Sequence, residues 1–563
     1  MRLLGLTACL AVVPLALAPV AMAQEEEPRP LPALTAAPDD ALTEALATGE
    51  LTEAEYALER AASVFGLPES RAEFGDVERA GRHDVTLYLR NLALRVDDLA
   101  GADRRQAKRI LARPPGGDVE IGNGWTHTES IFSPACSAIP GVELCVHWVD
   151  FPGDLDAPDP TDDDLDGVPN YVELALGTLE NVWAQEIGAL GYRAPLSDLT
   201  SADNGLDARF DVYLDDLGSD FVFGYCTTDD PNRDSPVIFA VSAYCVLDND
   251  YHPDQFGTAH TPQEFLAVTA AHEFHHASQF AYDWQEDVWL LEGTATNIEE
   301  TVYPAIDDNV FFLDFFSPIT HPAVSLDRGG FGDSEYGAWI FWRYLQEKVA
   351  GGDPAILREI WERADSRDPD PNTDGDEPAD DYSLLAVRKE LTERGLVFAD
   401  VFARFGIANR RLDYADASTA GYPSAPTSRT WGLGTNQRGA RTQSWKINHL
   451  ATRYFSFVPG PRSSPTGSLR LWITLPRSDT RASLVIVKTD NSVSVRYLKQ
   501  SATGQSNPRI AFGRGTIKRV DLVLSNGSTR LACWTSFGPP FYSCFGRPLD
   551  DARLFTFRAQ LSS

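Results

Sequence analysis

The sequence predicts an α+β protein made of three successive parts. Amphipathic helical patterns occupy residues 41–114, and a Pro-Pro-Gly-Gly run at Pro114 ends them. Strand-like runs and long helical patterns follow up to about residue 409. From about Ala440, short alternating runs with turn residues between them indicate a β-sandwich of roughly 120 residues. A chain of 563 residues is too long for one hydrophobic core, which agrees with several domains.

Residues 1–23 have the pattern of a secretory signal peptide. Arg2 supplies the positive charge, Leu3 to Val20 form the apolar run, and Ala21-Met22-Ala23 is a small-residue cleavage site. No other run of the sequence is long and apolar enough to span a bilayer. We therefore expect a secreted protein that is released from the membrane.

Residues 24–117 form the predicted helical N-terminal segment. Its first part, Gln24 to Asp39, is acidic and proline-rich, which is typical of disorder. Val85 to Leu89 fits either a strand or the start of a helix. Two interpretations of the whole segment stay open. It is either a propeptide that is removed on maturation or a permanent helical module, and we favour the propeptide.

The cysteines indicate an oxidising compartment. Seven are present, and removal of the signal peptide takes Cys9 away and leaves an even number. Closeness in sequence selects three disulfides from the fifteen pairings that six cysteines allow. The pairs are Cys136 with Cys145, Cys226 with Cys245, and Cys533 with Cys544.

The net charge of −34 argues against two classes of partner. Nucleic-acid binding depends on Lys and Arg that neutralise phosphates, and an anionic membrane surface makes the same demand. We expect neither partner. An acidic chain is instead suited to bind cations.

An acidic stretch between two strand candidates, Val142 to Val149 and Ala208 to Leu214, fits a twelve-residue calcium loop. Gly167 stands at the sixth position, where the loop turns sharply. Tyr171 to Ile187 supplies the outgoing helix but no helix precedes the loop, so the stretch resembles half an EF-hand. A solvated acidic turn is the alternative. The predicted Ca²⁺ ligands are Asp162, Asp164, Asp166, Val168 through its main-chain carbonyl, Asn170 and Glu173.

A predicted helix that starts at Thr261 carries the most specific motif. Thr261-Pro262-Gln263-Glu264 is a capping box with proline at the first helical position. His272 and His276 lie four residues apart, so both imidazoles face the same side of the helix and can bind one Zn²⁺. Glu273 lies beside them and can take a proton from a metal-bound water. The alternative is a histidine-rich core helix.

The next segment, Trp289 to Ala295, reads Trp-Leu-Leu-Glu-Gly-Thr-Ala. With the His-Glu-x-x-His motif, it makes the chain resemble the gluzincin metallopeptidases, above all the aminopeptidase N-like and peptidase-MA-like branches. The likeness covers roughly Asn204 to Leu345. The order of acidic loop, strands and motif helices also resembles a group of secreted bacterial proteins classed as metalloproteases. The resemblance implies that Glu292 is the third zinc ligand, with a surface glutamate as the alternative.

The same resemblance implies further roles. Either Glu299 or Glu300 orients a ligand histidine, unless both are solvated. Tyr336 matches the tyrosine that donates a hydrogen bond to the developing oxyanion, although Tyr344 or a packing role would also fit. An edge strand would pair with the substrate backbone, and Pro236 to Leu247 is our candidate, with a plain core strand as the alternative.

Together these features predict a secreted zinc metalloendopeptidase that hydrolyses proteins or peptides. The mature chain has no methionine and hence no Gly-x-Met-Glu-Asn segment, the amine-binding element of the aminopeptidase branch, so we favour an endopeptidase. Exported metallopeptidases often carry propeptides, which favours that view of residues 24–117. The catalytic domain would span residues 118–413, a linker 414–439 and the β-sandwich 440–563, with a surface or a carbohydrate as its ligand. The rival functions are an inactive peptidase-like, calcium-stabilised binding or adhesion protein and a hydrolase of non-peptide amides.

Overall fold

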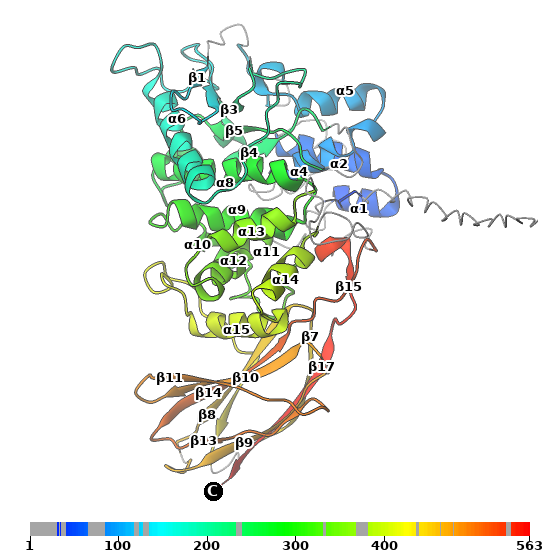
Figure 1. Ribbon diagram of the computed structural model, residues 1–563, viewed down its shortest axis with the longest axis vertical. Coiled ribbons are helices and arrows are strands. Elements are labelled where there is room, and N and C mark those ends of the chain that lie inside the picture. Colours follow the sequence, from blue (N-terminus) through cyan, green and yellow to red (C-terminus); the bar gives the residue numbers. More distant parts are fainter. Residues whose placement is uncertain are drawn as a thin grey trace, which may run out of the picture.

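The computed structural model describes most of the chain (Figure 1). The predicted signal peptide and nearly all of the proline-rich stretch after it lie outside the described residues. Those residues are 31–32, 34, 41–65, 85–117, 123–127, 134–205, 207–231, 239–329, 334–366, 381–434, 439–461, 463–476, 478–535 and 542–562.

The N-terminal region is helical, as the sequence predicts. It contains α1 (Ala41–Thr48), α2 (Glu53–Val64), α4 (Val85–Ala93) and α5 (Gly101–Ile110), with single 3₁₀ turns at Val96–Asp98 and Pro114–Gly116. The open choice at Val85 is settled in favour of a helix. All nine residues of α4 are buried, because this helix lies between α2 and the central sheet. Its polar side chains are buried with partners: Arg90 donates to the Glu286 carbonyl over 2.7 Å, and Thr86 accepts from the Cys226 N–H over 3.0 Å.

The central region is built on a five-stranded mixed sheet. Its order is β1 (Ala135–Cys136), β2 (Leu144–His147), β3 (Phe210–Asp215), β5 (Tyr244–Asp248) and β4 (Gly224–Thr227). The three inner strands run parallel, and β1 and β4 are antiparallel to their neighbours at the two edges. The inner strands are wholly buried.

The predicted edge strand is wrong. Of the run Pro236 to Leu247, the described part contributes the start of β5, which lies between β3 and β4 inside the sheet. The edge is occupied by β4, a four-residue strand that the sequence did not reveal. The alternative of a plain core strand therefore holds for β5. Strand order depends on which strands pair across the sheet, and an apolar run reads the same at the centre and at the edge.

One long helix covers the sheet next to β4 and β5, and a second long helix packs on the first (Figure 1). They are α8 (Pro262–Asp283), which begins with the predicted capping box at Thr261, and α9 (Val288–Val302). Alongside α8 lies α6 (Asn170–Trp183), which continues as a π-helical turn, Ala184–Ala189. The remaining helices are a 3₁₀ turn Leu217–Asp220, α7 (Pro253–Phe256), α10 (Val310–Phe315), α11 (Ser334–Gly337), α12 (Trp339–Tyr344), a π turn Leu345–Val349, α13 (Ala355–Arg363), α14 (Leu384–Glu393) and α15 (Phe398–Arg411).

The C-terminal region consists of β-sheet, as predicted. One sheet has the order β11 (Val493–Tyr497), β10 (Thr480–Lys488), β14 (Ile517–Asn526), β8 (Ala451–Pro459) and β6 (Arg429–Leu433). The second has the order β12 (Gln505–Ser506), β9 (Ser468–Thr474), β17 (Arg553–Ser562) and β7 (Gly439–Ile447), with β13 (Arg509–Ala511) also paired to β9. Residues from both sheets form one apolar cluster, so the sheets pack face to face. The strand β6 falls within residues 414–439, the expected linker.

Several contacts fasten the C-terminal region to the central region, and two of them lie at α15 and at the start of α9. Helix α15 packs on β10 and β14, where Tyr454 Oη donates to the Gly406 carbonyl over 2.7 Å. A small ribbon of β15 (Leu531–Ala532) and β16 (Arg547–Pro548) reaches the start of α9, where the Cys544 N–H donates to Asp287 Oδ2 over 2.7 Å. The second contact supports the helix that carries Glu292.

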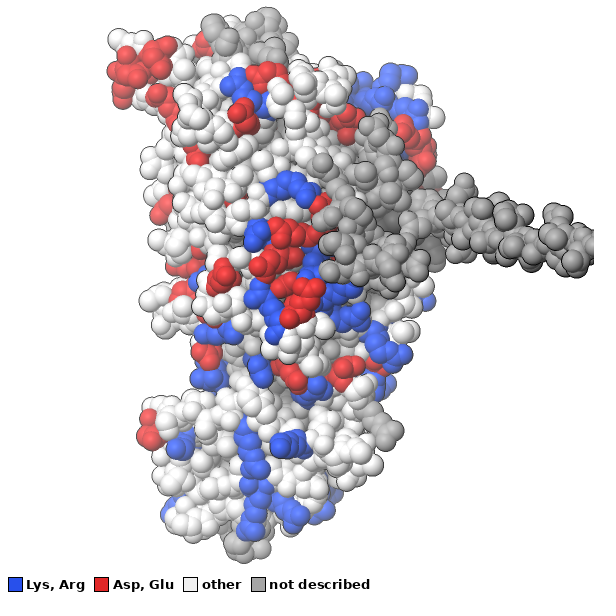
Figure 2. Space-filling model, in the orientation of Figure 1, with Lys and Arg blue, Asp and Glu red and all other residues white. Residues whose placement is uncertain are grey.

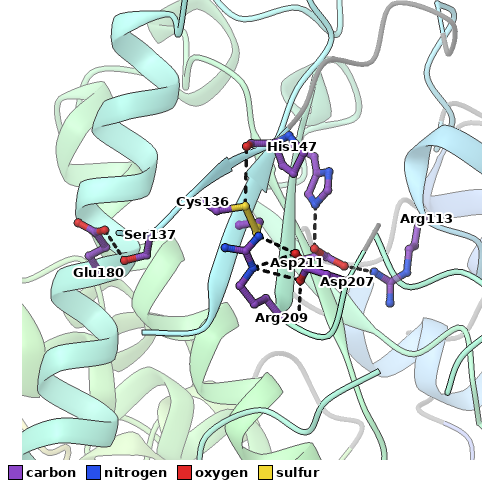
Figure 3. The surroundings of a disulfide bond; sticks show 10 residues. Arg113, Cys136, Ser137, His147, Glu180, Asp207, Arg209 and Asp211 are labelled. Carbon is purple, nitrogen blue, oxygen red and sulfur yellow. Dashed lines mark hydrogen bonds and ion pairs between the residues drawn. A yellow bond between two sulfur atoms is a disulfide. The ribbon is translucent and has the colours of Figure 1, made fainter. Parts of the chain in front are cut away.

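All three predicted disulfides are confirmed: Cys136–Cys145, Cys226–Cys245 and Cys533–Cys544. The first two join residues that face each other directly across neighbouring strands. Figure 3 shows the first disulfide beside the Arg209–Asp207 ion pair, which lies in the loop before β3. Disulfides of this number are consistent with an extracellular protein. In the described part of the chain, no helix has both the length and the apolar character needed to cross a membrane.

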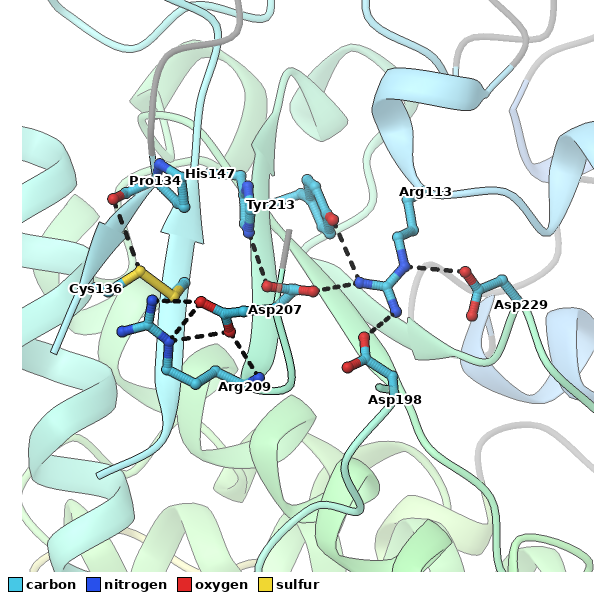
Figure 4. A network of polar contacts seen from close by, with 11 residues as sticks. Arg113, Pro134, Cys136, His147, Asp198, Asp207, Arg209, Tyr213 and Asp229 are labelled. Atoms are coloured by element: carbon cyan, nitrogen blue, oxygen red, sulfur yellow. Dashed lines mark hydrogen bonds and ion pairs between the residues drawn. A yellow bond between two sulfur atoms is a disulfide. The ribbon is translucent and has the colours of Figure 1, made fainter. Parts of the chain in front are cut away.

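Arg113 ties the N-terminal region to the sheet (Figure 4). Its guanidinium group forms ion pairs with Asp198, Asp211 and Asp229, and it also donates to Tyr213 Oη over 3.4 Å. Asp211 in turn accepts from His147 on β2 over 2.8 Å. Because Arg113, Asp198 and Asp211 are almost completely buried, removal of the arginine would leave uncompensated buried charge.

Candidate metal centre

The helices α8 and α9 bring His272, His276 and Glu292 together. Their potential ligand atoms all lie within 4.8 Å of one another. Glu292 Oε2 lies 3.3 Å from His272 Nε2 and 3.4 Å from His276 Nε2. All three side chains are buried, and Glu292 is fully so. The helical spacing accounts for the two histidines, and the antiparallel return of α9 supplies the glutamate.

Both imidazoles are held by their second nitrogen. His272 Nδ1 lies 2.6 Å from Glu299 Oε1, and His276 Nδ1 lies 2.8 Å from Gln279 Oε1. The amide of Gln279 donates from Nε2 to the Leu291 carbonyl and to Thr294 Oγ1, which fixes its oxygen toward His276. Each Nδ1 therefore carries the proton in a neutral ring, and each Nε2 offers a lone pair to the centre.

The residues present fit a metal ion. Two unprotonated Nε2 atoms and a carboxylate oxygen would face one another with no proton between them, which is repulsive unless a cation joins them. The second oxygen of Glu292, Oε1, is buried and makes no hydrogen bond with the described residues. Two imidazoles and one carboxylate are also a donor set that zinc binds in catalytic sites.

The charged groups of the cluster shift one another's pKa values. Burial would raise the pKa of Glu292, but the nearby charge of His276 and hydrogen bonds from both histidines lower it to about 2. Burial would lower the pKa of His272, but hydrogen bonds from it to Glu292 and Glu299 raise it well above its usual range. Burial also raises the pKa of Glu299 to about 7, against the lowering effect of His272. The centre therefore attracts positive charge, which either protons or a metal ion can supply.

Glu273 lies on the same helix, next to the cluster. It is 6% exposed, and burial raises its pKa, while the charges of His276 and His272 lower it. Thr86 Oγ1, on α4, donates to Glu273 Oε2 over 3.3 Å and accepts from the Cys226 N–H on β4 over 3.0 Å. The N-terminal region thus reaches the proposed general base. On the other side, Gly224 allows β4 to approach α8, because a Cβ there would lie 2.8 Å from Thr269 Cγ2 and 3.1 Å from Glu273 Cγ.

An open pocket borders the cluster. It has about 420 Å³ of empty space, part of which is open to solvent. Apolar side chains of Phe223, Val268 and Phe312 line it together with the polar groups of His272, Glu273 and Glu299. A pocket with apolar walls and a few convergent polar groups is the usual setting of a binding site.

Tyr336 lies beside the cluster, on α11. Its ring stacks on His272 with 6.0 Å between ring centroids and on Phe312 with 4.9 Å. The side chain is buried. Tyr344, the alternative, lies on α12 and packs on Phe405.

The residues next to the predicted ligands have different partners. Glu299 contacts His272, whereas the adjacent Glu300 forms an ion pair with Arg343. His275 points away from the cluster and pairs with the buried Glu186 over 2.8 Å. Sequence reasoning missed Gln279 and Thr86. The spacing of three residues from His276 could have revealed Gln279, but Thr86 has no local signal.

The predicted calcium loop groups three of its carboxylates. Asp162, Asp164 and Asp166 have potential ligand atoms within 4.8 Å of one another. Gly167 has a φ of 94°, the left-handed turn that the sixth position requires. Asp162 accepts from the N–H groups of Leu165 and Gly167, so the loop is already folded around this side chain. Asn170 is the first residue of α6, and its Oδ1 accepts from the Asp163 N–H over 3.0 Å.

Val168 and Glu173 complete the predicted loop. The Val168 N–H donates to Asp166 Oδ1 over 2.8 Å, so the residue lies in the same turn as the three carboxylates. Glu173 lies in the first turn of α6 and is exposed. Partial desolvation and the charges of Asp164, Asp166 and Asp162 raise its pKa.

Comparison with known proteins gives no family. No protein-family model and no curated protein matches the chain. Among solved structures, the pre-peptidase C-terminal domain of a collagenase from Bacillus anthracis matches with a TM-score of 0.15 and 8% identity, covering 25% of this chain and 100% of that one.

Two further solved structures are similar at the same low level. The periplasmic lysozyme inhibitor PliG of Aeromonas hydrophila has a TM-score of 0.15 and 8% identity over 24% of this chain and 96% of that chain. The GH115 4-O-methyl-α-glucuronidase BtGH115A has a TM-score of 0.13 and 8% identity over 56% and 46%. Similarity at this level identifies neither fold family nor function.

Proposed function

We propose that the protein is a secreted zinc-dependent metalloendopeptidase of the gluzincin type. One observation carries the proposal: His272, His276 and Glu292 converge from two helices, with both imidazoles oriented from behind and their Nε2 atoms directed at Glu292. The alternative, a histidine-rich core helix without a metal, does not explain why a buried carboxylate lies next to two such nitrogens.

The proposed roles follow from position. Zinc held by these three residues would lower the pKa of a bound water to about 7 and polarise a substrate carbonyl. Glu273 lies next to the site and would accept a proton from the attacking water and pass it to the leaving amine. Burial raises the pKa of Glu273, and this is the direction of shift that a carboxylate acting as both general base and general acid requires.

Tyr336 would donate its hydroxyl to the oxyanion that forms at the carbonyl. Its stacking on His272 supports this role because it places the ring beside the metal ligands. The open pocket along β4 and α8 would hold the substrate, with Phe223, Val268 and Phe312 contacting an apolar side chain. A pocket open to solvent suits a polypeptide that enters from the surface.

The loop with Asp162, Asp164 and Asp166 would bind Ca²⁺ as a structural ion. Its exposed carboxylates suit the weak affinity that extracellular calcium allows. The ion would brace the start of α6, the helix that packs alongside α8.

The contacts of the N-terminal segment favour a permanent module over a removable propeptide, at least for residues 85–117. Thr86 contacts Glu273, and Arg113 neutralises buried carboxylates of the central region. Removal of the segment would expose Glu273, but it would also leave Asp198 and Asp211 buried without their cationic partner. Breaking a buried ion pair in this way destabilises the fold by about 3–5 kcal/mol. We expect N-terminal sequencing of the active secreted protein to find a start before Val85. An active form that begins after Gly117 would support the propeptide instead.

The mechanism is tested by Glu273→Gln. The variant should bind zinc as the wild type does and lose casein hydrolysis by roughly 10²- to 10⁴-fold, because only the general base is removed. Glu264→Gln is the matched control. Glu264 lies on the same helix and is only partly buried, and glutamine preserves its capping box.

The outcomes separate the rival functions. A Glu273→Gln protein that cleaves casein at the wild-type rate contradicts the mechanism. A wild-type protein that holds one zinc ion and digests no member of a broad peptide library supports the binding protein or the hydrolase of non-peptide amides.

A further inference from the structure

Charge is distributed very unevenly along this chain. Residues 440–563 contain 18 Lys and Arg but only five Asp and Glu, whereas the rest contains 30 Lys and Arg and 77 Asp and Glu. In Figure 2, Lys and Arg dominate the charged groups on the C-terminal region, whereas groups of Asp and Glu lie on the rest of the molecule, one of them at the opposite end. The net charge of the whole chain conceals this strongly basic region.

The second C-terminal sheet presents an outer face without acidic groups. The strands β7, β9, β12, β13 and β17 contain six Lys and Arg and no Asp or Glu. Along β9, Leu469, Leu471 and Ile473 point into the core, so Arg470 and Trp472 point outward. The first sheet covers the inner face and α15 covers the first sheet, which leaves this outer face to solvent.

Arginines gather around Trp472 on this face. The guanidinium carbon of Arg470 lies 4.9 Å and that of Arg558 lies 5.2 Å from the Trp472 ring centroid. Arg558 stands directly opposite Trp472 in the β9–β17 register. On the other side of β9, Arg509 stands directly opposite Arg470. The three arginines thus come from three adjacent strands.

These arginines lack anionic partners among the described residues. Each is exposed, and none forms an ion pair with a described carboxylate; Arg509 and Arg558 instead donate to Ser468 Oγ and Gln560 Oε1. Like charges that face each other directly across two strands destabilise a sheet, and Arg470 with Arg509 is such a pair. Other arginines of the region do have partners, as Arg519 and Arg553 have Asp521 and Asp550. An external anion would relieve the repulsion.

We propose that the outer face of β9, β13 and β17 binds an acidic polysaccharide through Arg470, Arg509 and Arg558. Planar guanidinium groups bind carboxylates and sulfates through two parallel hydrogen bonds. Neighbouring strands lie about 4.8 Å apart, so the three groups form a row that suits a polymer with repeated charges better than a single ion.

Two observations favour a polysaccharide over a nucleic acid. Guanidinium groups already lie over the Trp472 ring, whereas proteins that bind single strands stack bases on free aromatic rings. The predicted export also places the protein among extracellular polymers. The surface would hold the enzyme at an acidic polymer while the distant cluster on α8 and α9 acts on protein; the binding itself does not depend on that activity.

The test measures binding of the full-length protein to heparin, polygalacturonate, dextran and duplex DNA over a range of salt concentrations. The wild type should bind heparin or polygalacturonate but not dextran. The triple variant Arg470→Gln, Arg509→Gln, Arg558→Gln should bind at least about tenfold more weakly, with a salt dependence reduced by about one unit of slope for each arginine that contacts the polymer. Its unchanged thermal unfolding would confirm that the sheet is intact.

The matched control is Lys488→Gln, Lys499→Gln, Lys518→Gln. It removes the same charge from exposed positions of the same region that lie outside the second sheet. Affinity within about threefold of the wild type supports a defined face. An equal loss in the control overturns the proposal, as does failure of the wild type to bind either acidic polysaccharide or tighter binding to DNA than to both.

Discussion

The two candidate metal sites of this protein are built in opposite ways. The cluster of His272, His276 and Glu292 is buried, and its ligands are oriented by groups outside it, namely Glu299 and Gln279. The loop with Asp162, Asp164 and Asp166 is largely exposed, and its carboxylates accept hydrogen bonds from the N–H groups of their own turn. A prearranged buried site pays the cost of ordering at folding, whereas an exposed loop can exchange its ion with solvent.

The difference has a chemical consequence. In the buried cluster, removing one charge disturbs several others, because Glu292 touches both histidines and His272 touches two carboxylates. In the loop, water screens each carboxylate from the next. Substitutions should therefore have large effects at the cluster and small effects at the loop.

The largest difference is expected for Glu299→Gln. Glutamine can still accept from His272 Nδ1, but it removes the negative charge that strengthens this ligand. Loss of such a supporting group weakens metal binding by roughly 10- to 100-fold. Zinc competition titration measures the change.

Glu300→Gln is the matched control for this variant. It makes the same chemical change at the adjacent residue, which contacts Arg343 and not a histidine. Zinc affinity there should stay at the wild-type value. Equal effects of both substitutions would show that the contact with His272 does not tune the site.

A smaller effect is expected from pH. The pKa of metal-free His272 is raised by Glu292 and Glu299, against burial, so this ring keeps its proton above its usual range. Zinc must displace that proton in order to bind. At pH values below the raised pKa, the zinc affinity should therefore fall about tenfold per pH unit for each proton that zinc displaces. His276 and Glu273 face the same ring from α8 and take part in the balance.

The same titration repeated between pH 8 and pH 6 measures this dependence. The zinc affinity should fall as the pH falls, because zinc and protons compete for the same nitrogens. Zinc affinity that stays constant over this range would contradict binding through the imidazoles. Calcium affinity of the loop should change little over the same range, because hydrogen bonds from the N–H groups of Gly167 and Leu165 hold the pKa of Asp162 below its usual value.

The smallest effect is expected at the loop. Millimolar Ca²⁺ should raise the melting temperature of the wild type by about 2–4 °C. Asp162→Asn should abolish this increase, because Asp162 would be the first ligand of the proposed loop. Asp163→Asn, with the same charge change outside the ligand positions, should retain it. Calorimetry with and without calcium decides between a calcium loop and a solvated acidic turn.

Local spacing explains what the sequence predicted well at the cluster. The helix repeat alone places His272 and His276 on one face, and the capping box at Thr261 marks the helix start. The turn at Gly167 and the disulfide pairs are also local, with Cys partners at most 19 residues apart. The position of Glu292 followed only from the likeness to known metallopeptidases, because nothing local brings it back to α8.

Long-range contacts explain what was missed. Thr86 reaches Glu273 across 187 residues, and no pattern near either residue foretells the contact. The edge position of β4 arises from pairing across the sheet, so an apolar run was assigned to the edge in its place. The basic face needs both the strand register and the charge distribution, and the average net charge pointed the other way.

By itself, the sequence determined the helices that carry the histidines, the turn of the acidic loop, the three cysteine pairs and the β character of the C-terminal region. These follow from periodicity and spacing over a few residues, where backbone geometry leaves little choice. Only the tertiary structure decided that Glu292 meets both imidazoles, that Glu299 rather than Glu300 contacts His272, and that Thr86 on α4 contacts Glu273. Those outcomes depend on how helices and strands pack, and packing is set by the whole core rather than by any one segment.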